Sequence, residues 1–174
     1  MKLQAGQKIT PFSVTTIKGE SLMVPDPSRK FTHLQFRRFA GCPICNFHLH
    51  TFSKGAGQLD AAGIREVVFF HSSVAEMKKY QDNIPFAVVA DPDKKYYKQF
   101  GVETSWRAPM SLKAQWAGIR GMILGKMGTK VENGPLGLPA DILIDQTGTV
   151  IAVKYGKHAY DQFEIPELLA VAVA

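Results

Sequence analysis

The sequence predicts an α/β fold, because strand-length apolar runs alternate with short helical segments along most of the chain. The run IREVVFFHS at 64–72 has the length and the continuous apolar character of a buried strand, and VAEMKKYQ after it has helical spacing. A strand at 31–39 and a helix from Pro43 complete a strand–helix–strand unit. Near the end, 140–145 and 149–156 have the pattern of two strands joined by a tight turn.

The first strand and helix enclose a short corner. FTHLQFRRF is rich in apolar and β-tolerant residues, and Ala40 and Gly41 follow it. Pro43 suits the first turn of a helix because it has no amide hydrogen to leave unpaired. An apolar face follows, made by Ile44, Phe47, Leu49 and Phe52. We expect this helix to end within 54–57.

The alternation continues through the second half of the chain. FAVVAD at 86–91 predicts a strand with a turn signal at its end, and KKYYKQFG predicts a short helix that Gly101 ends. EIPELLAVAV at 164–173 predicts the last helix.

The segment 104–137 is too long for a plain connection, so we treat it as an insert. Apolar residues at helical spacing behind Pro109 predict an amphipathic helix within it, and four glycines make the return path flexible. The apolar residues are Leu112, Trp116, Ile119 and Ile123. We expect this stripe to pack against the protein's own sheet, in preference to serving as a lid or as a homodimer contact.

Composition limits the class of protein. A chain of 174 residues with 45% hydrophobic residues fits a single domain, 1–174, with a sizeable core. It has no apolar run of the roughly 18 residues that span a bilayer and no secretory pattern at its start, so we expect a soluble cytoplasmic protein without a membrane partner. The net charge of +6 is concentrated between Thr104 and Lys130, which contains five basic residues and no acid. We interpret this charge as a solvated helix face and expect no nucleic-acid partner.

The sequence contains two cysteines, Cys42 and Cys45, in RRFAGCPIC. Cytosolic thiols are kept reduced, so this pair points to chemistry rather than to a structural disulfide. At the start of a helix, Cys42 meets unpaired N–H groups and the positive end of the helix dipole, which predicts a lowered thiol pKa. Cys45 lies one turn deeper, within reach of a mixed disulfide on Cys42. Either Arg37 or Arg38 can add positive charge, because strand alternation lets only one of them face the site.

Two other interpretations of the cysteines stay open. His48 and His50 follow them and imitate a zinc cluster, but all these ligands would lie on one short helix and no second cysteine pair exists. We therefore expect no metal and no cofactor. The cysteines can also be inert buried thiols, which would make the chain a non-catalytic binding protein.

Four stretches together resemble the thioredoxin-fold superfamily, and within it the alkyl hydroperoxide reductase/thiol-specific antioxidant (AhpC/TSA, peroxiredoxin-like) family. They are LQAGQKITPFSVTTIKGESL, FRRFAGCPIC, PFAVVADPDKKYYKQFGV and LPADILIDQTGTVIAVKYG. The resemblance implies a thioredoxin-like three-layer α/β/α sandwich with a central mixed sheet, an N-terminal hairpin, and the active cysteine at the start of the first core helix. It also implies a cis proline, here Pro139 after Leu138, which would shape a substrate groove at the start of the strand behind the insert.

The sequence departs from the PxxxTxxC motif of peroxiredoxins. It has Gln35 where the motif has proline and Phe39 where the motif has threonine. Pro139 stands where the family's arginine precedes the late strand. Because the usual donors to a peroxide are missing, we expect a thiol–disulfide oxidoreductase that acts on protein or small-molecule thiols and disulfides. Cys42 would attack and Cys45 would resolve. The alternative is a thiol peroxidase that reduces hydroperoxides through a sulfenic acid at Cys42, with electrostatic support from Arg38 or Arg107.

Overall fold

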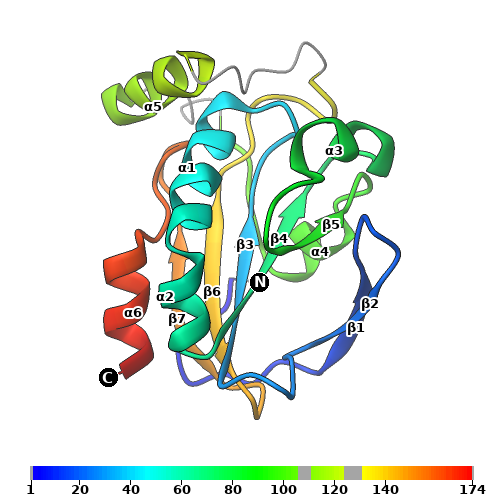
Figure 1. Cartoon of the computed structure of the whole chain (residues 1–174), viewed down its shortest axis with the longest axis vertical. Helices are drawn as coiled ribbons and strands as arrows, with labels where there is room; N and C mark the ends of the chain where they lie inside the picture. The colour runs from blue at the N-terminus through cyan, green and yellow to red at the C-terminus, as the bar shows by residue number, and fades with distance from the viewer. Residues whose placement is uncertain (1, 106–110, 124–130, 174) are drawn as a thin grey trace.

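A five-stranded mixed sheet forms the centre of the computed structural model, which describes residues 2–105, 111–123 and 131–173 (Figure 1). The strands lie in the order β5-β4-β3-β6-β7. Their bounds are β3 Phe31–Phe36, β4 Ile64–Phe70, β5 Ala87–Ala90, β6 Ala140–Asp145 and β7 Val150–Tyr155. A separate antiparallel hairpin joins β1, Phe12–Thr15, to β2, Ser21–Val24. The five strands predicted along the chain, the mixed sheet and the opening hairpin are confirmed.

Strand β3 occupies the middle of the sheet. It pairs in parallel with β4, which pairs in parallel with β5, and it pairs antiparallel with β6 on its other side. The chain returns from β3 to β4 through helix α1, Pro43–Lys54, and helix α2, Ala56–Ala61. Parallel neighbours need such a crossover, and α1 therefore starts directly beyond the carboxyl end of the central strand.

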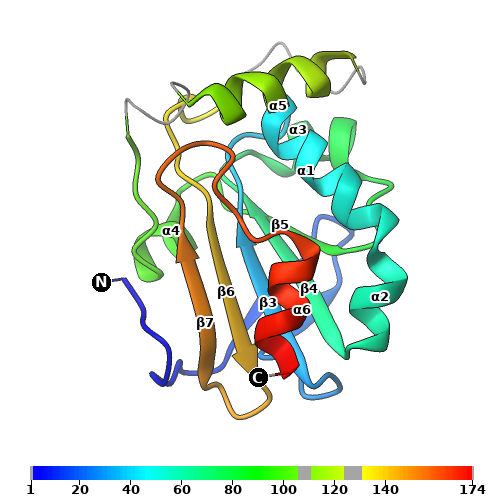
Figure 2. The same ribbon diagram turned by 90° about the vertical axis from the view of Figure 1, so that its left-hand side faces the viewer.

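The two faces of the sheet carry different helices (Figure 2). Leu34 and Phe36 of β3 face helix α4, Lys95–Gln99, and the hairpin. The alternate residues of the sheet face α1, α2, helix α3 at Val74–Gln81, and helix α6 at Ile165–Val173. Side chains alternate across a strand, so both faces of the apolar strands are buried. This arrangement confirms the predicted three-layer α/β/α sandwich.

The ends of the insert pair with each other through an antiparallel bridge between Thr104 and Gly137. Helix α5, Leu112–Ile123, lies between them and crosses one end of the molecule, above the start of α1 (Figures 1 and 2). Its buried residues are small: Ala114, Ala117 and Gly121.

The prediction that Trp116, Ile119 and Ile123 pack against the protein's own sheet is wrong, because all three are exposed. Small residues let two helices approach closely, and α5 uses its small face to lie on α1. An added Cβ on Gly121 would stand 2.1 Å from the Pro43 carbonyl oxygen. The large apolar residues therefore turn outward.

The prediction of a cis proline at Pro139 is also wrong. Among the described residues the cis peptide bond is Val24–Pro25, so Leu138–Pro139 is trans. The Leu138 N–H donates to the Glu103 carbonyl at 3.0 Å, and the Gly156 N–H donates to the Pro139 carbonyl at 2.9 Å. The chain is thus held in an extended path into β6 that needs no reversal.

Within the described ranges, no helix has both the length and the apolar character needed to cross a bilayer.

Candidate dithiol site

Cys42 caps the start of α1, as its position between a strand and a helix predicts. Its backbone is extended, with φ −68° and ψ 114°, and its Sγ accepts a hydrogen bond from the Cys45 N–H at 3.3 Å. The thiols of Cys42 and Cys45 are free, and each shifts the pKa of the other. The spacing of the two cysteines therefore brings both sulfurs to the first turn of α1.

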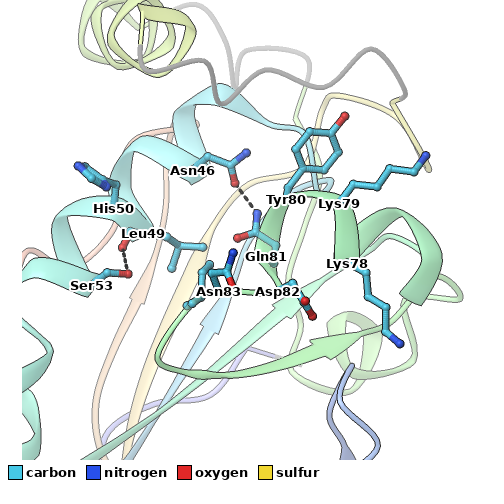
Figure 3. A pocket seen from close by; sticks show the side chains of 11 residues that line it. Asn46, Leu49, His50, Ser53, Lys78, Lys79, Tyr80, Gln81, Asp82 and Asn83 are labelled. Atoms are coloured by element: carbon cyan, nitrogen blue, oxygen red, sulfur yellow. Dashed lines mark hydrogen bonds between the residues drawn. The ribbon is translucent and has the colours of Figure 1, made fainter.

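Amide side chains fix the corner that leads to Cys42. Asn46 Nδ2 and Gln81 Nε2 both donate to the Ala40 carbonyl at 3.1 Å, and Gln81 Nε2 also donates to Asn46 Oδ1 (Figure 3). Ser72 Oγ accepts from the Ala40 N–H at 3.0 Å. Asn46 and Gln81 line a cavity of about 300 Å³ between α1 and α3. The corner is thus tied to both helices and to the end of β4.

Arg38 is the cation that reaches the sulfurs. Its Nη2 donates to Cys42 Sγ at 2.9 Å, its backbone N–H donates to Cys45 Sγ at 3.5 Å, and its Nη1 donates to the Pro135 carbonyl at 2.8 Å. Arg37 points elsewhere, to Asp141. The structure thus brings the sequence-predicted Arg38 to the cysteines, whereas Arg107 lies outside the described residues.

The two thiols share one charge. Burial raises the pKa of Cys45, but the hydrogen bond from Cys42 and the positive charge of Arg38 outweigh it and lower that pKa to about 6. Burial, the hydrogen bond with Cys45 and the negative charge of Cys45 raise the pKa of Cys42 well above its ordinary value. The lowered pKa that the sequence predicts at Cys42 is thus a property of the coupled pair rather than of Cys42 alone: one of the two thiols ionises easily, and one proton is left on the pair.

Both sulfurs are inaccessible, since Cys42 is 0% and Cys45 1% exposed. Helix α5 contributes to the cover, because Gly121 lies against Pro43 and Gly118 lies against Ile44, the two residues between the cysteines. Ala114 and Ala117 belong to the same apolar cluster as the two cysteines. A substrate reaches a sulfur only when this cover moves.

A buried charged cluster beneath α1 and α6 was not expected. His33 Nδ1 lies 2.8 Å from Glu66 Oε2, and His33 Nε2 lies 3.2 Å from Asp141 Oδ1. Arg37 Nη2 donates to Asp141 at 2.7 Å and to Gln35 Oε1 at 2.6 Å. Alternate polar residues in FTHLQF were the available signal, but that pattern is typical of a strand with one solvated face.

Opposite charges set the protonation of this cluster. Burial lowers the pKa of His33, but Glu66 and Asp141 outweigh it and raise the pKa to about 9. Burial raises the pKa of Asp141, yet Arg37 and His33 hold it well below its usual range. The charge of Arg37 also contributes to the lowered pKa of Cys45, so the cluster acts on the dithiol.

The histidines that follow the cysteines separate in the structure. His48 is buried, its Nε2 lies 2.9 Å from the Phe163 carbonyl, and burial lowers its pKa to about 3. His50 instead lines the cavity between α1 and α3 (Figure 3). Within the described ranges there is no group of three or more His, Cys, Asp or Glu residues placed to hold a metal ion.

The sequence of the chain is similar to that of a known protein family. Residues 49–158 match the model of the AhpC/TSA antioxidant enzymes, a segment that begins after the two cysteines. A Coxiella burnetii protein provisionally named peroxiredoxin bcp is 29% identical over 104 residues, which cover 59% of this chain and 69% of that protein.

Solved structures share the fold at low identity. Peroxidoxin BcpB of Mycobacterium tuberculosis superposes with a TM-score of 0.72 at 17% identity, over 98% of this chain and 97% of that one. A Chlorobium tepidum protein provisionally identified as the thiol:disulfide interchange protein DsbE gives 0.64 at 17% identity, over 98% and 99%. With a family match over more than half of its length and a thioredoxin-like fold throughout, the chain belongs to the AhpC/TSA antioxidant enzyme family, the peroxiredoxin-like branch of the thioredoxin fold.

Proposed function

We propose that the protein is a thiol–disulfide oxidoreductase that works through Cys42 and Cys45. The observation that carries this proposal is the pair of free thiols at the start of α1, with the Cys45 N–H donating to Cys42 Sγ and the Arg38 guanidinium 2.9 Å from Cys42 Sγ. Such a pair can hold one negative charge near neutral pH, and a thiolate is the species that attacks disulfides.

The shared proton suggests how the reaction runs. As a disulfide approaches, the Cys42 proton passes to the Cys45 thiolate, and the Cys42 thiolate attacks one substrate sulfur. The first substrate thiolate leaves and takes the proton from Cys45. The Cys45 thiolate then attacks Cys42 Sγ, releases the second substrate thiolate, and forms the Cys42–Cys45 disulfide. The substrate disulfide gains two electrons, and the dithiol loses two.

Leu138 and Pro139 are proposed as one wall of the substrate groove. Leu138 packs against the cluster that contains both cysteines, and the preceding Gly137 lies against the Arg38 side chain. The Leu138 N–H and the Pro139 carbonyl already bond within the protein. Their side chains, rather than these backbone groups, would therefore contact the partner, which we expect to be a protein or small-molecule thiol or disulfide.

A trapping experiment tests the proposal. Cys45→Ser should accumulate a mixed disulfide with oxidised glutathione at Cys42, visible by mass spectrometry as one added glutathionyl group, because the resolving sulfur is gone. Wild-type protein should instead lose two hydrogens in forming its internal disulfide, and Cys42→Ser/Cys45→Ser should remain unmodified. Wild-type protein that stays reduced against oxidised glutathione would contradict the proposal and favour inert thiols in a binding protein.

A thiol peroxidase is the second candidate. Two observations favour it: the chain belongs to the AhpC/TSA family, and the Arg38 guanidinium donates a hydrogen bond to Cys42 Sγ. Arg38 could stabilise charge on the leaving oxygen of a hydroperoxide. Against this, Phe39 and Gln35 supply no substitute donor: Phe39 is buried below the Arg38 guanidinium, and Gln35 bonds with Arg37 and Glu66. Stopped-flow mixing with hydrogen peroxide separates the candidates, since only the peroxidase oxidises rapidly without a disulfide substrate. Either chemistry fits a reducing compartment, and we propose the cytoplasm.

A further inference from the structure

Helix α5 carries an exposed apolar face that the dithiol chemistry does not use. Of the ten large apolar residues that are exposed in the described part of the chain, five lie on this one helix. They are Leu112, Trp116, Ile119, Met122 and Ile123, and we call them the α5 face. Single exposed apolar residues are normal on a protein surface, whereas a contiguous group marks an interaction site.

The charge around the α5 face has one sign. Lys113 and Arg120 are exposed on the same helix, and the Arg120 guanidinium lies 5.1 Å from the centre of the Trp116 ring. The surrounding sequence from Thr104 to Lys130 contains five basic residues and no acid. An occupant of this surface must therefore accept both apolar side chains and positive charge.

Helix α5 lies across one end of the molecule (Figure 2). The buried side of α5 rests on α1 through small residues, and its large apolar side chains are exposed. An aromatic ring, long aliphatic side chains and basic residues on one short helix are typical of helices that lie in the interface of a bilayer. Two copies of the chain meeting through this face would bring their Lys113 and Arg120 side chains together, which opposes self-association.

We propose that the α5 face docks on an anionic lipid surface. The apolar side chains would enter the region between headgroups and acyl chains, while Lys113 and Arg120 contact the anionic headgroups. The helix lies on the surface without crossing it, so the proposal replaces the expectation of no membrane partner without requiring a spanning segment. Docking places the start of α1, directly beneath α5, next to the lipid.

A matched pair of substitutions tests the docking. Met122 on α5 and Met23 on β2 are both 47% exposed, so Met122→Glu and Met23→Glu introduce the same charge at sites of equal exposure. Reduced protein is sedimented with phosphatidylcholine vesicles, with and without phosphatidylglycerol. We expect wild-type protein to bind the phosphatidylglycerol vesicles, Met122→Glu to lose about tenfold in affinity, and Met23→Glu to stay within about twofold. Thermal unfolding of each variant controls for loss of the fold.

Three results would overturn the proposal. Binding could be absent, or it could be equal with and without phosphatidylglycerol. Equal losses of vesicle affinity in Met122→Glu and Met23→Glu would show that the α5 face is not the surface that binds the lipid. Absent vesicle binding together with a dimer in analytical ultracentrifugation that Met122→Glu dissociates would assign the face to a second copy of the chain.

Discussion

At the scale of single residues, the adjacent Arg37 and Arg38 bind different partners on opposite sides of the chain. Arg37 is buried with Asp141 in the layer between the sheet and α1, whereas Arg38 turns to the sulfurs. The sequence predicts that only one of them faces the cysteines, because neighbouring side chains of a strand point to opposite sides. It could not tell which, since that depends on Asp141, 104 residues further along the chain from Arg37.

Replacing Arg38 with an uncharged residue should raise the pKa at which the dithiol loses its first proton. The guanidinium lowers the pKa of Cys45, so Arg38→Met should raise the midpoint of the pH profile of iodoacetamide alkylation by about one unit. Arg38→Lys should recover part of the shift through its remaining charge. Arg29→Met removes an arginine that pairs with Asp60 on α2 and should leave the midpoint unchanged. An unchanged midpoint in Arg38→Met would show that the cation does not set the ionisation of the pair.

At the scale of elements, the packing of α5 on α1 controls access to the cysteines. Gly121 and Gly118 contact Pro43 and Ile44, the residues between Cys42 and Cys45, so a displacement of α5 acts directly on the covering of the thiols. The contact is close because Gly121 has no side chain.

Two glycine substitutions on α5 should therefore differ in effect. Gly121→Ala places a Cβ 2.1 Å from the Pro43 carbonyl oxygen, which backbone on both sides cannot accommodate without moving the helix. We expect a lower melting temperature and faster alkylation of the thiols. Gly118→Ala meets Ile44 Cγ1 at 3.6 Å, an ordinary contact, and should be neutral or stabilising by up to about 1 kcal/mol through helix propensity. Equal alkylation rates in the two variants would mean that α5 is not the cover.

The order of helices and strands along the chain was predictable from the sequence, but which side of helix α5 is buried was not. The bounds of α3 and β6 follow from local apolar patterns, and both agree with the expected ranges. For α5 the same reasoning assumed that the largest apolar residues face inward, which fails where small residues allow closer contact. The trans bond at Pro139 had no local signal either, because that segment is fixed by hydrogen bonds with residues distant in the sequence: Leu138 N–H donates to the Glu103 carbonyl, and Gly156 N–H donates to the Pro139 carbonyl.

At the scale of the whole molecule, ionisable groups buried on one side of the sheet connect the core to the site. His33, Glu66, Arg37 and Asp141 come from β3, β4, the corner after β3, and β6, and they form alternating ion pairs. A buried charge is costly unless it is paired, so the cluster depends on the register of the central strands. Sequence patterns give no such pairing, because each partner lies on a different strand.

The cluster and the dithiol should act with opposite sign on stability between pH 6.5 and 9. The pKa of His33 rises from 6.5 to about 9 on folding, so its contribution to the free energy of unfolding is complete below pH 6.5 and is lost as the pH rises through about 9. The pKa of Cys45 falls from 9.0 to about 6, so its contribution is complete above pH 9 and is lost as the pH falls through about 6. In the reduced wild-type protein the two slopes largely cancel.

Removing the thiols should expose the histidine contribution. The double variant Cys42→Ser/Cys45→Ser should lose about 3 kcal/mol of unfolding free energy from pH 6.5 to pH 9, as measured by urea titration, while wild-type protein under reductant stays nearly constant. His48 and His71 have lowered pKa values and are neutral in the folded protein throughout this window, so they add only a smaller slope of opposite sign near their unfolded pKa of 6.5. The NMR titration of the His33 ring gives an independent readout that needs no further substitution. A flat profile in the double variant, or a His33 midpoint near 6.5, would show that the cluster does not hold its proton in the folded protein.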